Sequence, residues 1–134
     1  MKILIISQYF WPENFRINNI VKELIDRGHH VEVLTGEPNY PKGIISSEYL
    51  KNKPFYESYF GCKVHRVSVI PRKSGKNYQI LINYFSFFFN ASIYILKNFK
   101  KNSFNSIFTF GTSPITVSLL SFFSCFKNSK KVIW

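Results

Sequence analysis

Two apolar runs joined by an amphipathic segment determine what the first 36 residues can fold into. Residues 2–7 (KILIIS) are apolar after a single lysine, which is typical of a strand covered on both faces of a parallel sheet. Residues 17–28 place apolar side chains at helical spacing and end at Gly28, a residue that commonly follows a helix. Residues 30–36 (HVEVLTG) are a second apolar run. The order strand, helix, strand predicts a right-handed βαβ unit, and hence an α/β fold with a Rossmann-like parallel sheet and helices on both faces.

Polar and aromatic side chains follow each expected strand of this sheet. The third such strand is residues 105–110, and the other expected elements are an extended segment at 59–72, helices at 78–99 and 115–126, and a strand at 130–134. In open parallel sheets, ligands bind beyond the carboxyl ends of the strands. The loops there should converge on one crevice, whose candidate substrate-binding residues are Trp11, Glu13, Asn14, Arg16, Asn39, Tyr40, Thr112 and Ser113.

These loops have both a functional and a structural interpretation. Arg16, beside the positive end of a helix, suits a phosphate, and Trp11 offers a flat face for a sugar ring. The amide of Asn39 and the phenol of Tyr40, in the loop after the second strand, suit sugar hydroxyls. In the structural alternative, Asn14 caps the helix, Glu13 favours its dipole and Trp11 packs in the core. The sequence leaves both interpretations open.

Positive charge is confined to one half of the chain. The net charge is +11, and the seven acidic residues all lie at or before position 57, where seven bases balance them. Residues 58–134 carry the other eleven bases and no acid. Such a one-sided field favours an anionic partner, namely anionic lipid, a phosphorylated substrate or nucleic acid. The alternative is a basic surface that only aids solubility.

The expected helix at residues 78–99 is unusually apolar. No charge occurs from position 77 to 96, and Asn83, Ser86 and Asn90 form one narrow polar stripe. Basic residues flank the helix, and we assign them to a membrane-surface site: Arg72, Lys73, Lys76, Lys97, Lys100 and Lys101. Three interpretations remain open, which are a helix packed against the sheet, an interfacial helix on anionic lipid, and a transmembrane helix.

The sequence names no catalytic residue and no metal site. It contains no G-x-G-x-x-G, P-loop, H-E-x-x-H or zinc spacing, which disfavours a dinucleotide-binding domain or a nucleoside triphosphatase. Cys62 and Cys125 are far apart and are expected to be reduced thiols. His65 has no nucleophile or carboxylate close to it in sequence. Residues 37–58, with two prolines and Gly43 near their start, are expected to form a loop.

Residues 1–16 (MKILIISQYFWPENFR) resemble the opening of the bacterial retaining glycosyltransferases of family four. Among these, the likeness is greatest to the colanic-acid and O-antigen enzymes that transfer fucosamine-type sugars. It continues through residues 27–36 (RGHHVEVLTG) and 38–43 (PNYPKG), and it reappears at 111–114 (GTSP). The resemblance implies that residues 1–134 are the N-terminal, acceptor-side Rossmann-like domain of a GT-B enzyme, truncated before the C-terminal donor-binding domain.

The resemblance also implies partners and a location. The acceptor would be a lipid-linked saccharide of O-antigen, capsular or exopolysaccharide synthesis, at the inner face of the cell membrane in the cytoplasm. The full-length enzyme would use a nucleotide-sugar donor and no other cofactor, and this chain would be inactive alone. A separately encoded C-terminal half is a candidate partner, and nucleic acid is not expected. The alternative from a different class is a stand-alone basic module that binds membrane surfaces.

Overall fold

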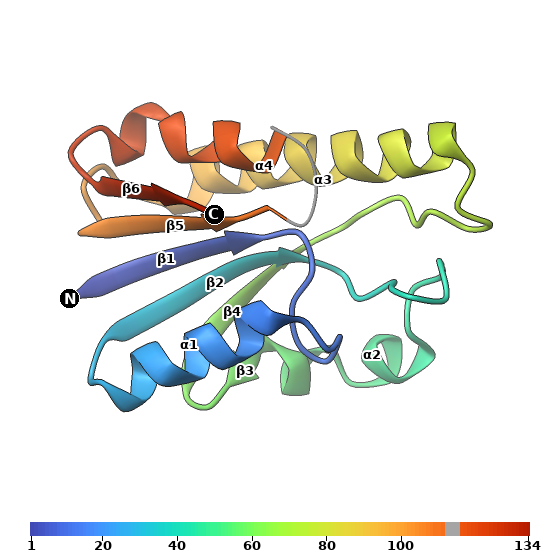
Figure 1. Ribbon diagram of the computed structural model, residues 1–134, viewed down its shortest axis with the longest axis horizontal. Helices are drawn as coiled ribbons and strands as arrows, with labels where there is room; N and C mark the ends of the chain where they lie inside the picture. Colours follow the sequence, from blue (N-terminus) through green and yellow to red (C-terminus); the bar gives the residue numbers. More distant parts are fainter. Residues whose placement is uncertain (112–115) are drawn as a thin grey trace.

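The computed structural model describes residues 1–111 and 116–134 as an α/β fold around a six-stranded mixed sheet (Figure 1). The strands are β1 (Lys2–Ser7), β2 (His30–Gly36), β3 (Ser58–Tyr59), β4 (Cys62–Val67), β5 (Ser106–Phe110) and β6 (Lys130–Ile133). Their order is β3-β4-β2-β1-β5-β6, and only the β3–β4 pair is antiparallel. The order of the five parallel strands reverses at β1, which is compatible with a Rossmann-like fold.

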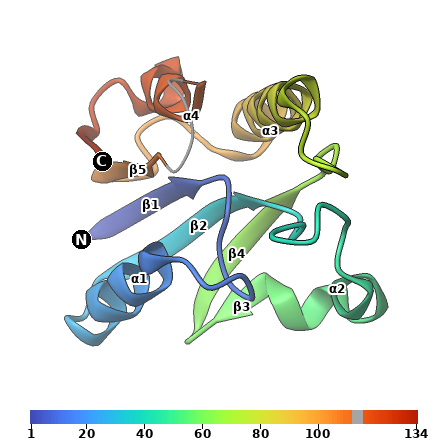
Figure 2. The same cartoon turned by 45° about the vertical axis from the view of Figure 1, so that its right-hand side comes forward.

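Helices cover both faces of the sheet (Figure 2). The α-helices are α1 (Arg16–Asp26), α2 (Ser47–Lys51), α3 (Asn77–Asn98) and α4 (Thr116–Leu119). The two views place α1 on one side of the sheet and α3 with α4 on the other. The βαβ prediction is thereby confirmed, with both strands at their expected bounds.

Two segments differ from the sequence prediction. The expected loop at 37–58 contains α2, which Ser46 caps by accepting a hydrogen bond from the Tyr49 N–H (3.4 Å), and a 3₁₀ helix at Lys53–Glu57. The expected helix at 115–126 is short in its described part. It consists of α4 followed by 3₁₀ turns at Leu120–Phe122 and Ser124–Phe126, because Phe123 has an extended backbone that ends the first turn.

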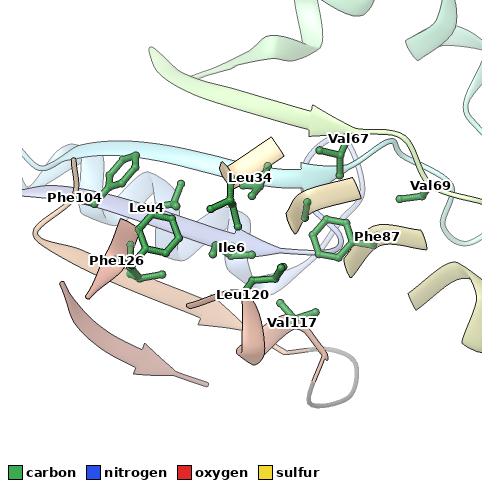
Figure 3. Close-up of a cluster of buried hydrophobic side chains, with 13 residues drawn as sticks. Leu4, Ile6, Leu34, Val67, Val69, Phe87, Phe104, Val117, Leu120 and Phe126 are labelled. Atoms are coloured by element: carbon green, nitrogen blue, oxygen red, sulfur yellow. The ribbon is translucent and has the colours of Figure 1, made fainter. Parts of the chain in front are cut away.

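Alternate residues of β1 enter two separate cores, as strand geometry requires. Ile3 and Ile5 pack with α1, where Ile17 and Val21 are buried. Leu4 and Ile6 belong to the other core, which Figure 3 shows. That core contains Leu34, Val67, Phe87, Ala91, Ile95, Phe104, Ile107, Val117, Leu120 and Phe126. Burial on both faces explains why β1 reads as a continuous apolar run.

The polar stripe of α3 faces the protein. Asn83 is fully buried (0% exposed) and donates from Nδ2 to the carbonyl of Ile70 (2.7 Å). The N–H of Ile70 donates to Ser86 Oγ (2.9 Å), and Asn90 Nδ2 donates to the carbonyl of Ser68 (2.7 Å). The stripe therefore satisfies backbone groups of the extended segment that follows β4.

The opposite face of α3 is apolar and turned to solvent. Its exposed side chains are Tyr78, Leu81, Ile82, Phe85, Phe89, Ile93 and Leu96. The face toward the sheet is narrow, with Phe87, Ala91 and Ile95 in the core. Among the described helices, α3 alone is long and apolar enough to cross a membrane by length and composition. The interpretation of a helix packed against the sheet is thus confirmed for one face of α3 only.

Candidate functional site

Glu13 joins the loops that follow β1 and β2. Its Oε1 accepts the N–H groups of Asn39 (2.8 Å) and Tyr40 (2.6 Å), and both Glu13 and Asn39 are buried. Asn39 Nδ2 donates to the carbonyl of Glu37 (2.9 Å), which tightens the second loop. The structure thus brings three of the expected site residues, Glu13, Asn39 and Tyr40, into direct contact. We call the region formed by residues 8–16 and 37–43 the rim.

A hollow of about 320 Å³ opens beside this junction. Its lining comes from the two loops and the start of α2, and it comprises Pro12, Glu13, residues 38–42 and residues 44–48. The ring of Tyr40 is 46% exposed, and Lys42, Ser47 and Glu48 are exposed polar residues. The hollow therefore combines an aromatic face with several polar groups, a mixture typical of small-molecule sites.

Arg72 lies across the aromatic side chains of the rim. Its guanidinium carbon is 5.1 Å from the ring centre of Tyr9 and 5.3 Å from that of Tyr40. It also donates a hydrogen bond to the Tyr9 hydroxyl. The ring of Phe15 stacks on Tyr9 at 5.2 Å and so completes the aromatic group. Arg72 was assigned to the membrane-surface bases from the sequence, whereas the structure places it at the rim.

A buried network of hydrogen bonds holds Tyr9, the hydrogen-bond partner of Arg72, in place. The Tyr9 hydroxyl donates to Asn83 Oδ1 (3.0 Å), and Gln8 Nε2 donates to the same oxygen (2.7 Å). Burial raises the pKa of Tyr9 to about 12, although Arg72 acts in the opposite direction. Tyr9 therefore keeps its proton at neutral pH, which it needs for donating to Asn83 while it accepts from Arg72.

Arg66 ties three segments together behind the rim. Its guanidinium donates to the carbonyls of Tyr56 (3.1 Å), Gly36 (3.1 Å) and Trp11. Burial lowers the pKa of Arg66 to about 10, so it remains charged at neutral pH. Sequence reasoning missed this role, because an arginine whose hydrogen-bond partners are all backbone carbonyls leaves no motif.

For the loop after β1, the structural alternative, in which Trp11 packs in the core and Asn14 caps the helix, is correct only in part. The ring of Trp11 is half-buried and packs against Phe55 (5.6 Å), Tyr56 (5.1 Å) and Tyr59 (5.6 Å). The expected cap at Asn14 is wrong, because Phe15 is the N-cap and makes no side-chain cap bond.

Asn18 braces this loop in place of Asn14. It accepts from the Trp11 N–H (3.1 Å) and donates to the Glu13 carbonyl (2.7 Å). Asn14 and Arg16 are exposed, while Thr112 and Ser113 lie outside the described residues.

His65 has partners that its sequence neighbours did not reveal. Its Nε2 is 2.7 Å from Glu32 Oε2, and its Nδ1 is 2.8 Å from the hydroxyl of Tyr94 on α3. Lys2 pairs with the other oxygen of Glu32 (3.0 Å). Burial lowers the pKa of His65, although Glu32 opposes the shift. This group joins β1, β2, β4 and α3, so its role is structural.

The described residues hold no group of three or more His, Cys, Asp or Glu side chains that could bind a metal ion. Both thiols are free in the structure, and burial raises the pKa of Cys62 to about 11. No protein-family model matches the chain, and neither the curated proteins nor the solved structures contain a match.

Proposed function

We propose that this chain is the acceptor-binding half of a sugar transferase of the GT-B type, and that the rim holds the saccharide of a lipid-linked acceptor. The observation that carries the proposal is the Glu13 junction, which fixes the loops of two neighbouring parallel strands beside a hollow of about 320 Å³. Its location beyond the carboxyl ends of β1 and β2 is where open α/β sheets bind ligands.

The chemistry of the hollow suits a saccharide. Tyr40 offers a ring for the apolar face of a sugar, while Ser47, Glu48 and Lys42 offer donors and acceptors for its hydroxyls. The resemblance of residues 9–16 and 38–43 to family-four glycosyltransferases supports the same assignment. The saccharide would lie on Tyr40 with its hydroxyls toward the start of α2.

Glu13 is not the catalytic base in this proposal. Its carboxylate is buried, and both Asn39 and Tyr40 donate to the same oxygen. Burial raises the pKa of Glu13, and its backbone hydrogen bonds act against that shift. Glu13 shapes the loops, and the nucleotide-sugar donor and the catalytic groups would come from a second domain. We therefore expect the rim to bind the acceptor without itself supplying the catalytic groups.

An NMR titration tests the proposal. A water-soluble citronellyl-diphosphate N-acetylhexosamine is added to the isotope-labelled chain, and saturable amide shifts are expected at Asn39, Tyr40 and Ser47. The control ligand is citronellyl diphosphate without the sugar, which should not move Ser47. An intact spectrum with no saturable shift in the rim would contradict the proposal.

A second candidate function, a stand-alone membrane-surface module, is favoured by the outward face of α3. Phe89, at its centre, is 64% exposed although it belongs to a 22-residue helix of a folded domain. A continuous apolar stripe of this kind marks a contact with a partner or a membrane. The partner proposed here is an anionic membrane surface, at the cytoplasmic face of the cell membrane.

The exposed positive charges near α3 favour an anionic membrane surface as the partner. Five exposed lysines remain at the two ends of α3 once Arg72 is assigned to the rim: Lys73, Lys76, Lys97, Lys100 and Lys101. Each base near an anionic surface contributes about 1 kcal/mol, and buried apolar area adds to this. Positions 58–134 contain no acidic side chain to oppose the attraction. The two functions are compatible, because a lipid-linked acceptor resides in such a membrane.

Vesicle flotation separates the two functions. The double variant Phe85→Ser, Phe89→Ser should lose binding to phosphatidylglycerol vesicles, as should charge reversal at Lys97, Lys100 and Lys101. The matched control is Phe60→Ser, because Phe60 is equally exposed (61%) but lies at the turn between β3 and β4. Vesicle binding without any rim shifts in the titration would leave the membrane module as the function. Binding that Phe85→Ser, Phe89→Ser leaves intact would contradict the role of α3.

A further inference from the structure

We infer that Arg72 is the phosphate-binding residue of the rim, in place of Arg16. The ligand class is a phosphate or diphosphate ester, and its identity as the diphosphate of a lipid-linked saccharide rests on the proposed function. The side chain of Arg72 has unused hydrogen-bonding capacity. A guanidinium carries five N–H donors, and within the described residues that of Arg72 donates a hydrogen bond to the Tyr9 hydroxyl.

The Nε of Arg72 is buried and has no hydrogen-bond partner among the described residues. Arg72 also makes no ion pair with an acid in the part of the chain that the structure describes. The other arginines differ. Arg27 pairs with Glu23 (2.8 Å), Arg66 donates to three carbonyls, and Arg16 is exposed to water. A half-buried guanidinium with an unused donor is costly unless an anion completes it.

The structure also holds Arg72 in place. Tyr9 and Tyr40 contact its guanidinium, and Tyr9 is itself fixed by its bond to Asn83. A planar guanidinium that is already oriented loses little entropy when it binds two phosphate oxygens. Arg16 has no comparable support, since it is exposed at the first turn of α1.

The surroundings of Arg72 are basic. Lys73 and Lys76 follow it in the turn that leads into α3, and the Lys73 N–H donates to the Gly43 carbonyl (2.8 Å), which holds the turn against the rim. Of the two acids of the rim, Glu13 is buried and already accepts two N–H groups, and Glu37 pairs with Lys53 (3.2 Å). Arg72 thus lies between the saccharide hollow and the start of the exposed face of α3, where the phosphate of a membrane-anchored ligand would pass.

The test follows the arginine Nε–H signals by NMR while inorganic pyrophosphate is added. The chain has four arginines, so the signals can be assigned by single substitutions. We expect a saturable shift of the Arg72 signal and no saturable shift of the Arg27 signal. Arg72→Lys retains the charge but loses the planar fork, and it should weaken pyrophosphate binding about tenfold. Arg16→Lys is the matched control and should leave the affinity unchanged.

Two arms identify the source of the phosphate. Free pyrophosphate represents a diphosphate ligand, and phosphatidylglycerol vesicles present a lipid headgroup. A saturable Arg72 shift in either arm supports the inference and names the source. It is overturned if neither arm moves Arg72, or if Arg72→Lys keeps full affinity with a native amide spectrum. If the sugar ligand shifts Ser47 but no ligand shifts Arg72, this inference alone is refuted. If Arg72 shifts but the sugar ligand leaves Ser47 unmoved, the saccharide proposal alone is refuted.

Discussion

The carbonyl of Gly43 accepts a hydrogen bond from the N–H of Lys73 at 2.8 Å, and this contact attaches the loop after β2 to the turn before α3. The two segments are 30 positions apart in the chain. Through this contact the rim and the amino end of the exposed helix form one corner of the molecule. The relative position of the hollow, Arg72 and the apolar face therefore depends on it.

Alanine at Gly43 should break this attachment. Gly43 has φ +71°, and an added Cβ would lie 2.1 Å from the Lys73 carbonyl oxygen. Gly75 has a similar φ of +76°, but its Cβ would meet nothing within 4 Å. We expect Gly75→Ala to cost about 1–2 kcal/mol from the left-handed backbone alone, and Gly43→Ala to cost clearly more. Urea unfolding measures both, and equal losses would show that the contact is unimportant.

Removal of the Glu13 carboxylate should loosen the rim. Glu13→Ala leaves the N–H groups of Asn39 and Tyr40 without their acceptor. The expected loss is about 1–3 kcal/mol for each buried group left unpaired. Glu13→Gln is the control, because its side-chain oxygen can still accept, and most of the stability should remain. If both variants were equally unstable by urea unfolding, the charge and not the acceptor would hold the loops.

Alanine substitutions at two phenylalanines of α3 should have very different effects on the free energy of unfolding. Phe87 is fully buried in the core that Figure 3 shows, and Phe87→Ala should cost about 3–5 kcal/mol. Phe89, two positions away, points to solvent, and Phe89→Ala should change the free energy of unfolding by less than about 0.5 kcal/mol. Calorimetric or urea unfolding of the two variants checks this. A large loss from Phe89→Ala would mean that the face is covered within the domain.

Stability should fall in mild acid because of His65. Burial lowers the pKa of His65 in the folded state, so the unfolded chain takes up the proton first as the pH falls below the ordinary value of about 6.5. The free energy of unfolding should then decrease by up to about 1.4 kcal/mol per pH unit until the folded state is protonated as well. Urea unfolding between pH 7 and 5 measures this slope.

His65→Gln should flatten the slope, whereas His29→Gln, at the end of α1, should retain it. Glu13, whose pKa is raised chiefly by burial, acts in the opposite sense and loses stability as the pH rises through its titration. It does so equally in both variants, so their difference reports His65 together with its hydrogen-bonded partner Glu32. An unchanged slope in His65→Gln would assign the acid sensitivity to another group.

The spacing of apolar residues was sufficient to predict the βαβ unit, because β1 and β2 are buried on both faces and α1 is buried on one. It was also sufficient for the extent of α3, but not for its orientation. A narrow polar stripe on an apolar helix normally faces water, whereas Asn83 here bonds the backbone at Ile70. The backbone that needs these partners follows β4, and its position depends on the tertiary fold.

Topology was sufficient to predict which loops lie together, whereas individual contacts could not be predicted from the sequence. The carboxyl ends of β1 and β2 do bring Glu13 and Asn39 together, as the parallel order requires. The roles of Arg66 and Arg72 could not be read from the sequence. Their partners are backbone carbonyls and aromatic rings far away in the chain, and such partners leave no fixed spacing.

The most direct measurement is the broadening of amide signals by a nitroxide-labelled lipid in bicelles that contain phosphatidylglycerol and the lipid-diphosphate sugar. If the apolar face of α3 and the rim serve one membrane-bound acceptor, broadening should be strongest at Phe85 and Phe89 and clear at Lys73 and Tyr40. It should be absent at Asp26, at the end of α1 on the other side of the sheet. Broadening greatest on α1, or confined to α3 with the rim unaffected, would contradict a shared site.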